Sequence, residues 1–186
     1  MNTFFTISEI ALLLILVYQD FKDRSISSIA LLILFILFSI QSIRTNNLTQ
    51  AGIYFGINLF IPFVQVAGLT MYFSIKNKRF MNFIDVYMGL GDILFFILLC
   101  TVFSPANFLP FYLGSLIASV ILFLALKKLK AIKTAEVPLA GIMSVMLIIV
   151  LTVKWIKPGI DLYDDYWVLN FLNTNSLTSS FPFGEG

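Results

Sequence analysis

The stretch Gly89-Leu90-Gly91-Asp92 leads directly into the apolar run 93–103. It places an aspartate, with two glycines before it, at the threshold of a segment that can enter a membrane. An ionisable group in such a place is expensive to bury and therefore indicates a functional site. A second aspartate, Asp20, stands at the end of the first apolar run, 4–19. We expect these two acids to meet.

The composition indicates an integral membrane protein. Hydrophobic residues make up 59% of the chain and charged residues 12%, against roughly one quarter charged in soluble domains. A spanning helix needs about 20 residues, so 186 residues hold at most about six spans. We expect one membrane domain, residues 1–157, followed by a less apolar extracytoplasmic tail, residues 158–186.

The predicted fold is all-α, a polytopic bundle of about six transmembrane helices. The six apolar runs are residues 4–19, 29–43, 51–75, 93–103, 109–126 and 139–155. The fourth helix is expected to start earlier, near Ile84, and Pro62 is expected to kink the third. The first run is expected to stay in the protein, because residues 1–19 lack the basic residues of a cleavable signal peptide.

Several partners and cofactors are not expected. A net charge of +2 without a basic, aromatic surface does not favour nucleic acid. Cys100 is the only cysteine, so neither an intramolecular disulfide nor a cysteine zinc module can form. The chain has no histidine, the commonest metal ligand. We therefore predict no metal and no cofactor, and Cys100 as a buried small hydrophobe.

The basic residues predict the orientation in the membrane. Nine of the twelve Lys and Arg residues fall in the first, third and fifth connections: Lys22, Arg24, Lys76, Lys78, Arg79, Lys127, Lys128, Lys130 and Lys133. The positive-inside rule then places both termini outside the cytoplasmic (inner) membrane. Asp20 ends the first helix and Asp92 opens the fourth, so both acids would lie at the cytoplasmic boundary.

Two carboxylates can hydrolyse a peptide bond without a metal or a nucleophilic side chain. One takes a proton from water while the other donates a proton to the carbonyl oxygen. Two like charges in a poorly solvated site force this division, because both cannot ionise cheaply. Gly89 and Gly91 would let the backbone bend and a substrate approach. The local pattern equally fits Asp92 as the N-cap of its helix, with the glycines in a helix contact.

Three stretches resemble the signatures of the type IV prepilin peptidase family. Residues 20–28, Asp-Phe-Lys-Asp-Arg-Ser-Ile-Ser-Ser, resemble the first, in which Arg follows the Asp by four places and Ile by six. Gly89-Leu90-Gly91-Asp92 matches the second, Gly-x-Gly-Asp. Residues 137–141, Val-Pro-Leu-Ala-Gly, resemble the Ile-Pro-Phe segment that opens a late helix. The resemblance covers most of residues 1–155.

The resemblance implies a membrane aspartic endopeptidase that removes the basic leader from prepilins and pilin-like precursors at the cytoplasmic face. It carries the catalytic acids onto Asp20 and Asp92, with Gly89 and Gly91 beside them. Arg24 and Asp85 are possible secondary site residues. The chain departs from the family at residues 27–28, where Ser-Ser replaces Pro-Asn, and at Leu94, where a basic residue is frequent. A single cysteine also implies a cleavage-only form, because larger members carry a cysteine zinc module and a methyltransferase activity.

Two alternatives stay open. One is a presenilin-like intramembrane aspartic protease, although Gln19 precedes Asp20 where that group has tyrosine. The other is a non-enzymatic transport or assembly subunit in which the acids are structural or bind ions.

Overall fold

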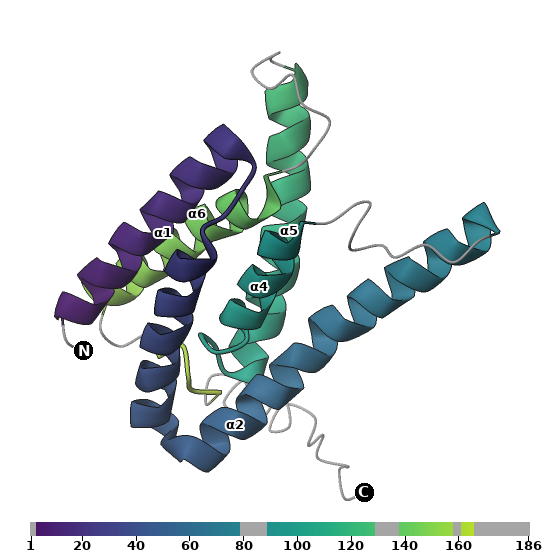
Figure 1. The fold of residues 1–186 in the computed structure, drawn as a ribbon. Coiled ribbons are helices and arrows are strands. Elements are labelled where there is room, and N and C mark those ends of the chain that lie inside the picture. The colour runs from purple at the N-terminus through teal and green to yellow at the C-terminus, as the bar shows by residue number, and fades with distance from the viewer. Residues whose placement is uncertain (1–2, 79–88, 129–137, 158–160, 166–186) are drawn as a thin grey trace, which may run out of the picture.

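The computed structural model describes residues 3–78, 89–128, 138–157 and 161–165. Within these ranges the regular secondary structure is entirely α-helical (Figure 1). The helices are α1 (Thr3–Asp23), α2 (Ser28–Asn77), α4 (Leu90–Leu99), α5 (Pro105–Lys128) and α6 (Leu139–Ile156). The predicted all-α class is confirmed for this part of the chain.

A short loop joins α1 to α2. Arg24 leaves α1 in the left-handed region, at φ 52°. Ser27 is the N-cap of α2, and its side chain accepts a hydrogen bond from the Ala30 N–H at 3.5 Å. The Gln19 side chain accepts a second bond from the Ser27 N–H at 3.0 Å. A serine at the N-cap satisfies an amide that the helix itself leaves unpaired, so the Ser-Ser departure supplies the start of the helix.

The helix α2 bends sharply at Asn47 (Figure 1). Its dihedral angles there, φ 66° and ψ 158°, are not helical. Positive φ combined with ψ of about 160° is a conformation that glycine adopts and other residues rarely do. We expected a kink at Pro62, but the non-helical residue within α2 is Asn47. The bend divides α2 into two straight arms, which diverge from Asn47 in a V shape (Figure 1).

The expected count of six spans is not supported. Four of the described helices are long and apolar enough to cross a membrane: α1, α2, α5 to Ala125, and α6. The helix α4 has only 10 residues, or about 15 Å at 1.5 Å per residue, against a hydrocarbon core of about 30 Å. Residues 100–103, which follow the helix, are not α-helical. Asn58 donates to the carbonyl oxygens of Cys100 (3.1 Å) and Phe103 (2.8 Å) in this stretch.

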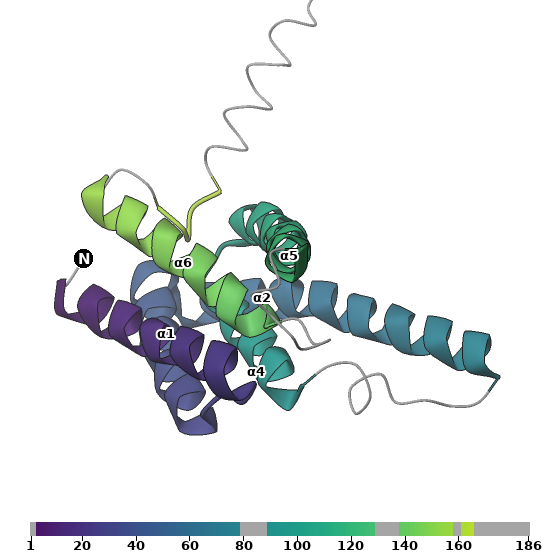
Figure 2. The ribbon, with the colours of Figure 1, turned by 90° about the horizontal axis from the view of Figure 1, so that it is seen from above.

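The helices α1 and α6 lie side by side and antiparallel, as the two views agree (Figures 1 and 2). The helix α4 packs on α2 and also contacts α6. The buried residues at these contacts form one apolar core, which includes Leu16, Phe95, Leu99 and Met143. This packing brings the end of α1 and the beginnings of α4 and α6 to the same end of the bundle.

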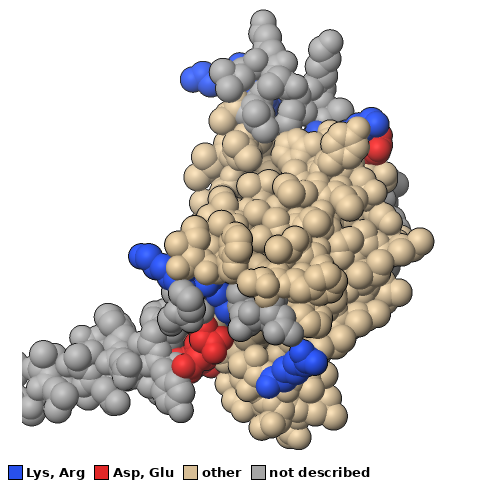
Figure 3. All heavy atoms as spheres, turned by 90° about the vertical axis from the view of Figure 1, so that its left-hand side faces the viewer, with Lys and Arg blue, Asp and Glu red and all other residues tan. Residues whose placement is uncertain are grey.

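The outer surface of the helices is apolar. Large hydrophobic side chains are widely exposed, among them Phe4 at 76%, Phe63 at 67% and Ile117 at 60%. On the face seen in Figure 3, an uncharged band separates charged residues near the upper and lower ends. Surface of this kind is unfavourable in water and suits lipid. The described helices are thus compatible with a multi-pass membrane protein.

Candidate active site

Asp20 lies in the last turn of α1 and is 6% exposed. Its Oδ2 atom accepts a hydrogen bond of 2.6 Å from the backbone N–H of Gly141, near the start of α6. A Cβ at position 141 would lie 2.8 Å from this oxygen and 3.1 Å from both the Asp20 Cβ and the Phe21 ring. Only glycine at 141 therefore lets α6 approach α1 closely enough for this bond.

Asp92 reaches the same helix from the other side. It is the third residue of α4, and its Oδ1 atom accepts a hydrogen bond of 3.2 Å from the Ala140 N–H. The N-cap position of α4 is held by Gly89, which makes no side-chain cap bond. Asp92 is therefore not the N-cap of its own helix; it binds the N-terminus of α6 and also the backbone of Gly89.

The two carboxylates thus share the first turn of α6. The first N–H groups of a helix have no partner within it, and the N-cap Pro138 supplies no side-chain bond. Asp20 and Asp92 take the amides of consecutive residues, Gly141 and Ala140. They are also near enough for their charges to act on each other. The helix N-terminus favours negative charge, while mutual repulsion opposes the ionisation of both acids.

The loop after α1 lies beside Asp20 and packs against the start of α4. Arg24 lies near enough for its charge to act on the Asp20 carboxylate. A Cβ at Gly91 would lie 3.1 Å from the Ile26 Cδ1 and 3.2 Å from its Cβ. The missing side chain of Gly91 therefore lets the start of α4 pack on the loop.

The glycines do not act as bending points in the way we expected. Gly89 has φ −72° and ψ 148°, an extended conformation that other residues adopt. Gly91 lies within α4, and no described glycine has positive φ. Glycine is needed at position 91 because a neighbouring side chain approaches closely, not because the backbone adopts an unusual conformation.

The remaining candidates lie as follows. Asp23 is exposed at the end of α1, and Leu94 is 42% exposed on α4. Asp85 lies outside the described residues. Cys100 is buried, and its thiol donates to the Phe96 carbonyl at 3.1 Å. Within the described part of the chain, no three His, Cys, Asp or Glu side chains gather as a metal site would require.

An apolar cavity of about 530 Å³ lies beside α4. Its lining residues come from α2 and α4: Gly56, Leu59, Phe60, Pro62, Phe63, Val66, Ala67, Ile93, Phe96 and Ile97. Ile93 directly follows Asp92 in the chain. The cavity therefore lies along the helix that carries Asp92, although neither acid lines it.

Both acids were predicted from the sequence, but their amide partners were not. Residues 140–141 appeared only as part of the third resembling stretch, with no role attached. A sequence does not show which backbone N–H groups bind a carboxylate. These partners can be recognised only once the three segments are placed together in the structure. Glycine at 141, directly after the start of an apolar helix, was the available signal.

No family model, curated protein or solved structure matches this chain.

Proposed function

We propose that this protein is a membrane aspartic endopeptidase that removes the leader peptide of type IV prepilin-like precursors at the cytoplasmic face. The observation that carries the proposal is the meeting of Asp20 and Asp92 at the first turn of α6. The three stretches that resemble the peptidase family lie far apart in the sequence. They are the same three segments that supply the two acids and the two amides.

The chemistry follows from the two carboxylates. The ionised acid takes a proton from a water molecule, which attacks the scissile carbonyl, while the protonated acid donates to the carbonyl oxygen. Asp20 uses one oxygen on an α6 amide and has a second for water or substrate, whereas Asp92 bonds both an α6 amide and the Gly89 amide at the start of its own helix. Because the pair titrates as a unit, we assign the roles of acid and base to the pair rather than to one residue.

The ends of the helices support the assignment of the site to the cytoplasmic side. The last turns of α1, α2 and α5 contain Lys22, Lys76, and Lys127 with Lys128. In Figure 1 the ends of α1 and α5 point upward and the end of α2 points to the upper right, while α4 begins at its own upper end. Basic residues favour the cytoplasmic side of a membrane, so the acids would face the same compartment as an unprocessed leader.

The cavity beside α4 supports a substrate that is itself membrane-embedded. The cavity is lined by apolar side chains of α2 and α4, the helix that carries Asp92. An adjoining apolar segment of the precursor fits this lining. Gly56 has open space around it, which permits a helix to pack closely there.

The product is expected to carry an unmodified new N-terminus. The chain has one cysteine and therefore no cysteine zinc module, and we assign it no methyltransferase activity. Mass spectrometry of a precursor processed by the purified protein should show the mass of the unmethylated product. A product heavier by one methyl group would contradict the cleavage-only assignment.

Co-expression with a candidate prepilin tests the main proposal. Conversion of the precursor to a shorter form, with a new N-terminus at the leader boundary, is the expected result. Cleavage within unrelated transmembrane helices, with no leader removal, would instead favour the presenilin-like alternative. If no precursor or helix is cut by well-folded protein, a non-enzymatic subunit becomes the better interpretation.

A further inference from the structure

A second buried polar cluster lies at the opposite end of the α1–α6 pair. Glu9 on α1 is 1% exposed, and its Oε1 atom accepts a bond of 2.5 Å from the Gln41 side chain on α2. Lys154, in the last turn of α6, is near enough for its charge to act on Glu9. Both residues belong to helices that can span a membrane. Ionisable groups in such segments require a partner.

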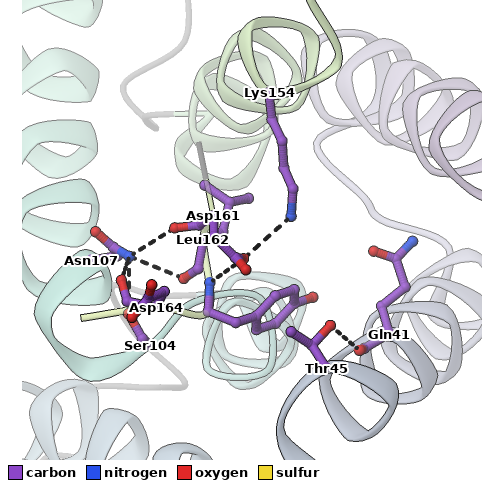
Figure 4. A network of polar contacts seen from close by, with 9 residues as sticks. Gln41, Thr45, Ser104, Asn107, Lys154, Asp161, Leu162 and Asp164 are labelled. Atoms are coloured by element: carbon purple, nitrogen blue, oxygen red, sulfur yellow. Dashed lines mark hydrogen bonds and ion pairs between the residues drawn. The ribbon is translucent and has the colours of Figure 1, made fainter. Parts of the chain in front are cut away.

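Lys154 is held from more than one side. Its Nζ atom lies 3.9 Å from Asp161 Oδ1, and its side chain is 12% exposed (Figure 4). The same atom lies 5.0 Å from the centre of the Tyr163 ring, within the range of a cation–π contact. The ammonium group is therefore held by residues beyond α6 and lies within electrostatic range of Glu9 on α1.

The residues beyond α6 form a return segment, residues 161–165, which is bonded to the start of α5. The Asn107 side chain faces three of its carbonyl oxygens, those of Asp161 (3.4 Å), Leu162 (3.2 Å) and Asp164 (3.0 Å) (Figure 4). The Ser104 N–H donates to the Leu162 carbonyl at 2.8 Å. Leu162 is only 6% exposed, so the return segment is part of the packed bundle.

We propose that Lys154 is a positioning residue, which fixes the placement of α6 along α1 through Glu9 and the return segment and so keeps Gly141 at Asp20. The reason is geometric. A slide of α6 by one residue is about 1.5 Å, which would exceed the reach of the 2.6 Å bond between Asp20 and Gly141. The same slide would withdraw the lysine from a buried carboxylate, and leaving such a group unpaired is strongly unfavourable.

This inference does not depend on the peptidase reaction. It concerns only how one rigid helix links two polar contacts, one at Gly141 and the other at Lys154. It can therefore be tested without a substrate. A failure of the test would leave the proposed function standing, and a failure of the proposed function would leave this inference standing.

Disulfide cross-linking between α1 and α6 provides the measurement. In a Cys100→Ser background, the pair Asp20→Cys and Gly141→Cys replaces two positions whose Cβ atoms would lie 3.1 Å apart, close to the ~3.5–4.5 Å of disulfides. The rate of cross-linking under mild oxidant is read from the loss of thiols that accept a maleimide mass tag. The parent pair is expected to cross-link quickly.

In this background Lys154→Met should slow cross-linking about tenfold, because Glu9 is left buried without its cation. Glu9→Gln alone should also slow cross-linking, and the double variant should be no slower than Lys154→Met, because the two residues act as one pair. Lys157→Met is the matched control: Lys157 is exposed three residues further on, and its loss should change nothing. An unchanged rate in Lys154→Met, or effects of the two variants that simply add, would overturn the proposal.

Accumulation of folded protein keeps the test decisive. If Lys154→Met does not accumulate in the membrane but the double variant with Glu9→Gln does, the double variant is compared with the parent: slow cross-linking supports the proposal, and the parent rate overturns it. If neither accumulates, the contribution of the lysine does not run through Glu9, and the proposal is wrong.

Discussion

Gly141 determines how closely α1 and α6 can pack. Its amide is the partner of Asp20, and the space of its missing side chain is filled by Asp20 and Phe21. One residue earlier, the Ala140 amide binds Asp92. The arrangement of both acids therefore depends on two positions whose side chains carry no chemistry of their own.

Asp20→Asn and Asp92→Asn should each reduce precursor cleavage about 10²–10⁴-fold, the usual contribution of a general acid or base. Asparagine keeps the size of the side chain but cannot share a proton as the pair does. The double variant should be no worse than either single one, because the two residues act as a unit. The assay is precursor conversion in membranes with matched protein levels.

Asp23→Asn is the control for the first acid, since Asp23 is exposed and three residues away, and it should keep most of the activity. Asp85→Asn is expected to do the same. Full activity in Asp20→Asn would break the peptidase interpretation, and loss in Asp85→Asn alone would mean that the second acid is wrongly assigned.

Gly141→Ala should reduce cleavage about tenfold or more, because a Cβ only 2.8 Å from Asp20 Oδ2 must push the helices apart, and overpacking of this kind costs about 1–3 kcal/mol. Gly114→Ala on α5 is the matched control, since its Cβ would meet nothing within 4 Å. Initial rates of precursor conversion compare the two. Equal rates for the two variants would show that the Asp20 contact is not needed.

At the residue level, the acids could be predicted and their partners could not. Asp20 and Asp92 stand out because an ionisable group beside an apolar run is unusual. Their meeting was expected from topology, and the structure brings both to α6. The role of Gly91, by contrast, depends on where Ile26 lies, which is a tertiary contact that no local pattern contains.

Among the elements, α1, α5 and α6 follow their apolar runs, whereas the region between α1 and α5 does not. The expected connection at 44–50 is helical except at Asn47, where α2 bends. The expected fourth span is the short helix α4, and Asn58 from α2 bonds the carbonyls of Cys100 and Phe103 just beyond its end. The hydrophobic pattern predicts the length of an apolar segment well, but it does not reveal a contact with a side chain of another helix.

The bend in α2 predicts a test at Asn47. Asn47→Gly should preserve stability, because glycine adopts positive φ freely. Asn47→Val should lower the free energy of unfolding by about 1–2 kcal/mol, because a β-branched residue is strained at φ 66°. Thermal unfolding in detergent measures both. Thr49→Val, at an exposed helical position two residues on, is the control; equal midpoints for the two valine variants would contradict the importance of the bend.

For the whole molecule, the distribution of basic residues predicts the topology in the membrane. In a chain whose Cys100 has been replaced, single cysteines at residues 22–25, 76–79 and 127–133 should react from the cytoplasmic side only. A cysteine beyond Lys157 should react from outside. The reason is that nine of the twelve Lys and Arg residues lie in the first three of these regions. Labelling of residues 127–133 from outside would overturn the arrangement.

The shared helix end has a consequence for the order of synthesis. Of the three helices that build the site, α6 comes last in the chain. A nascent chain that has already inserted α1 and α4 possesses both acids but lacks the amides that hold them together. Under the proposed function, the enzyme therefore becomes active only after α6 has been synthesised and inserted. A chain that is still on the ribosome cannot cut its neighbours.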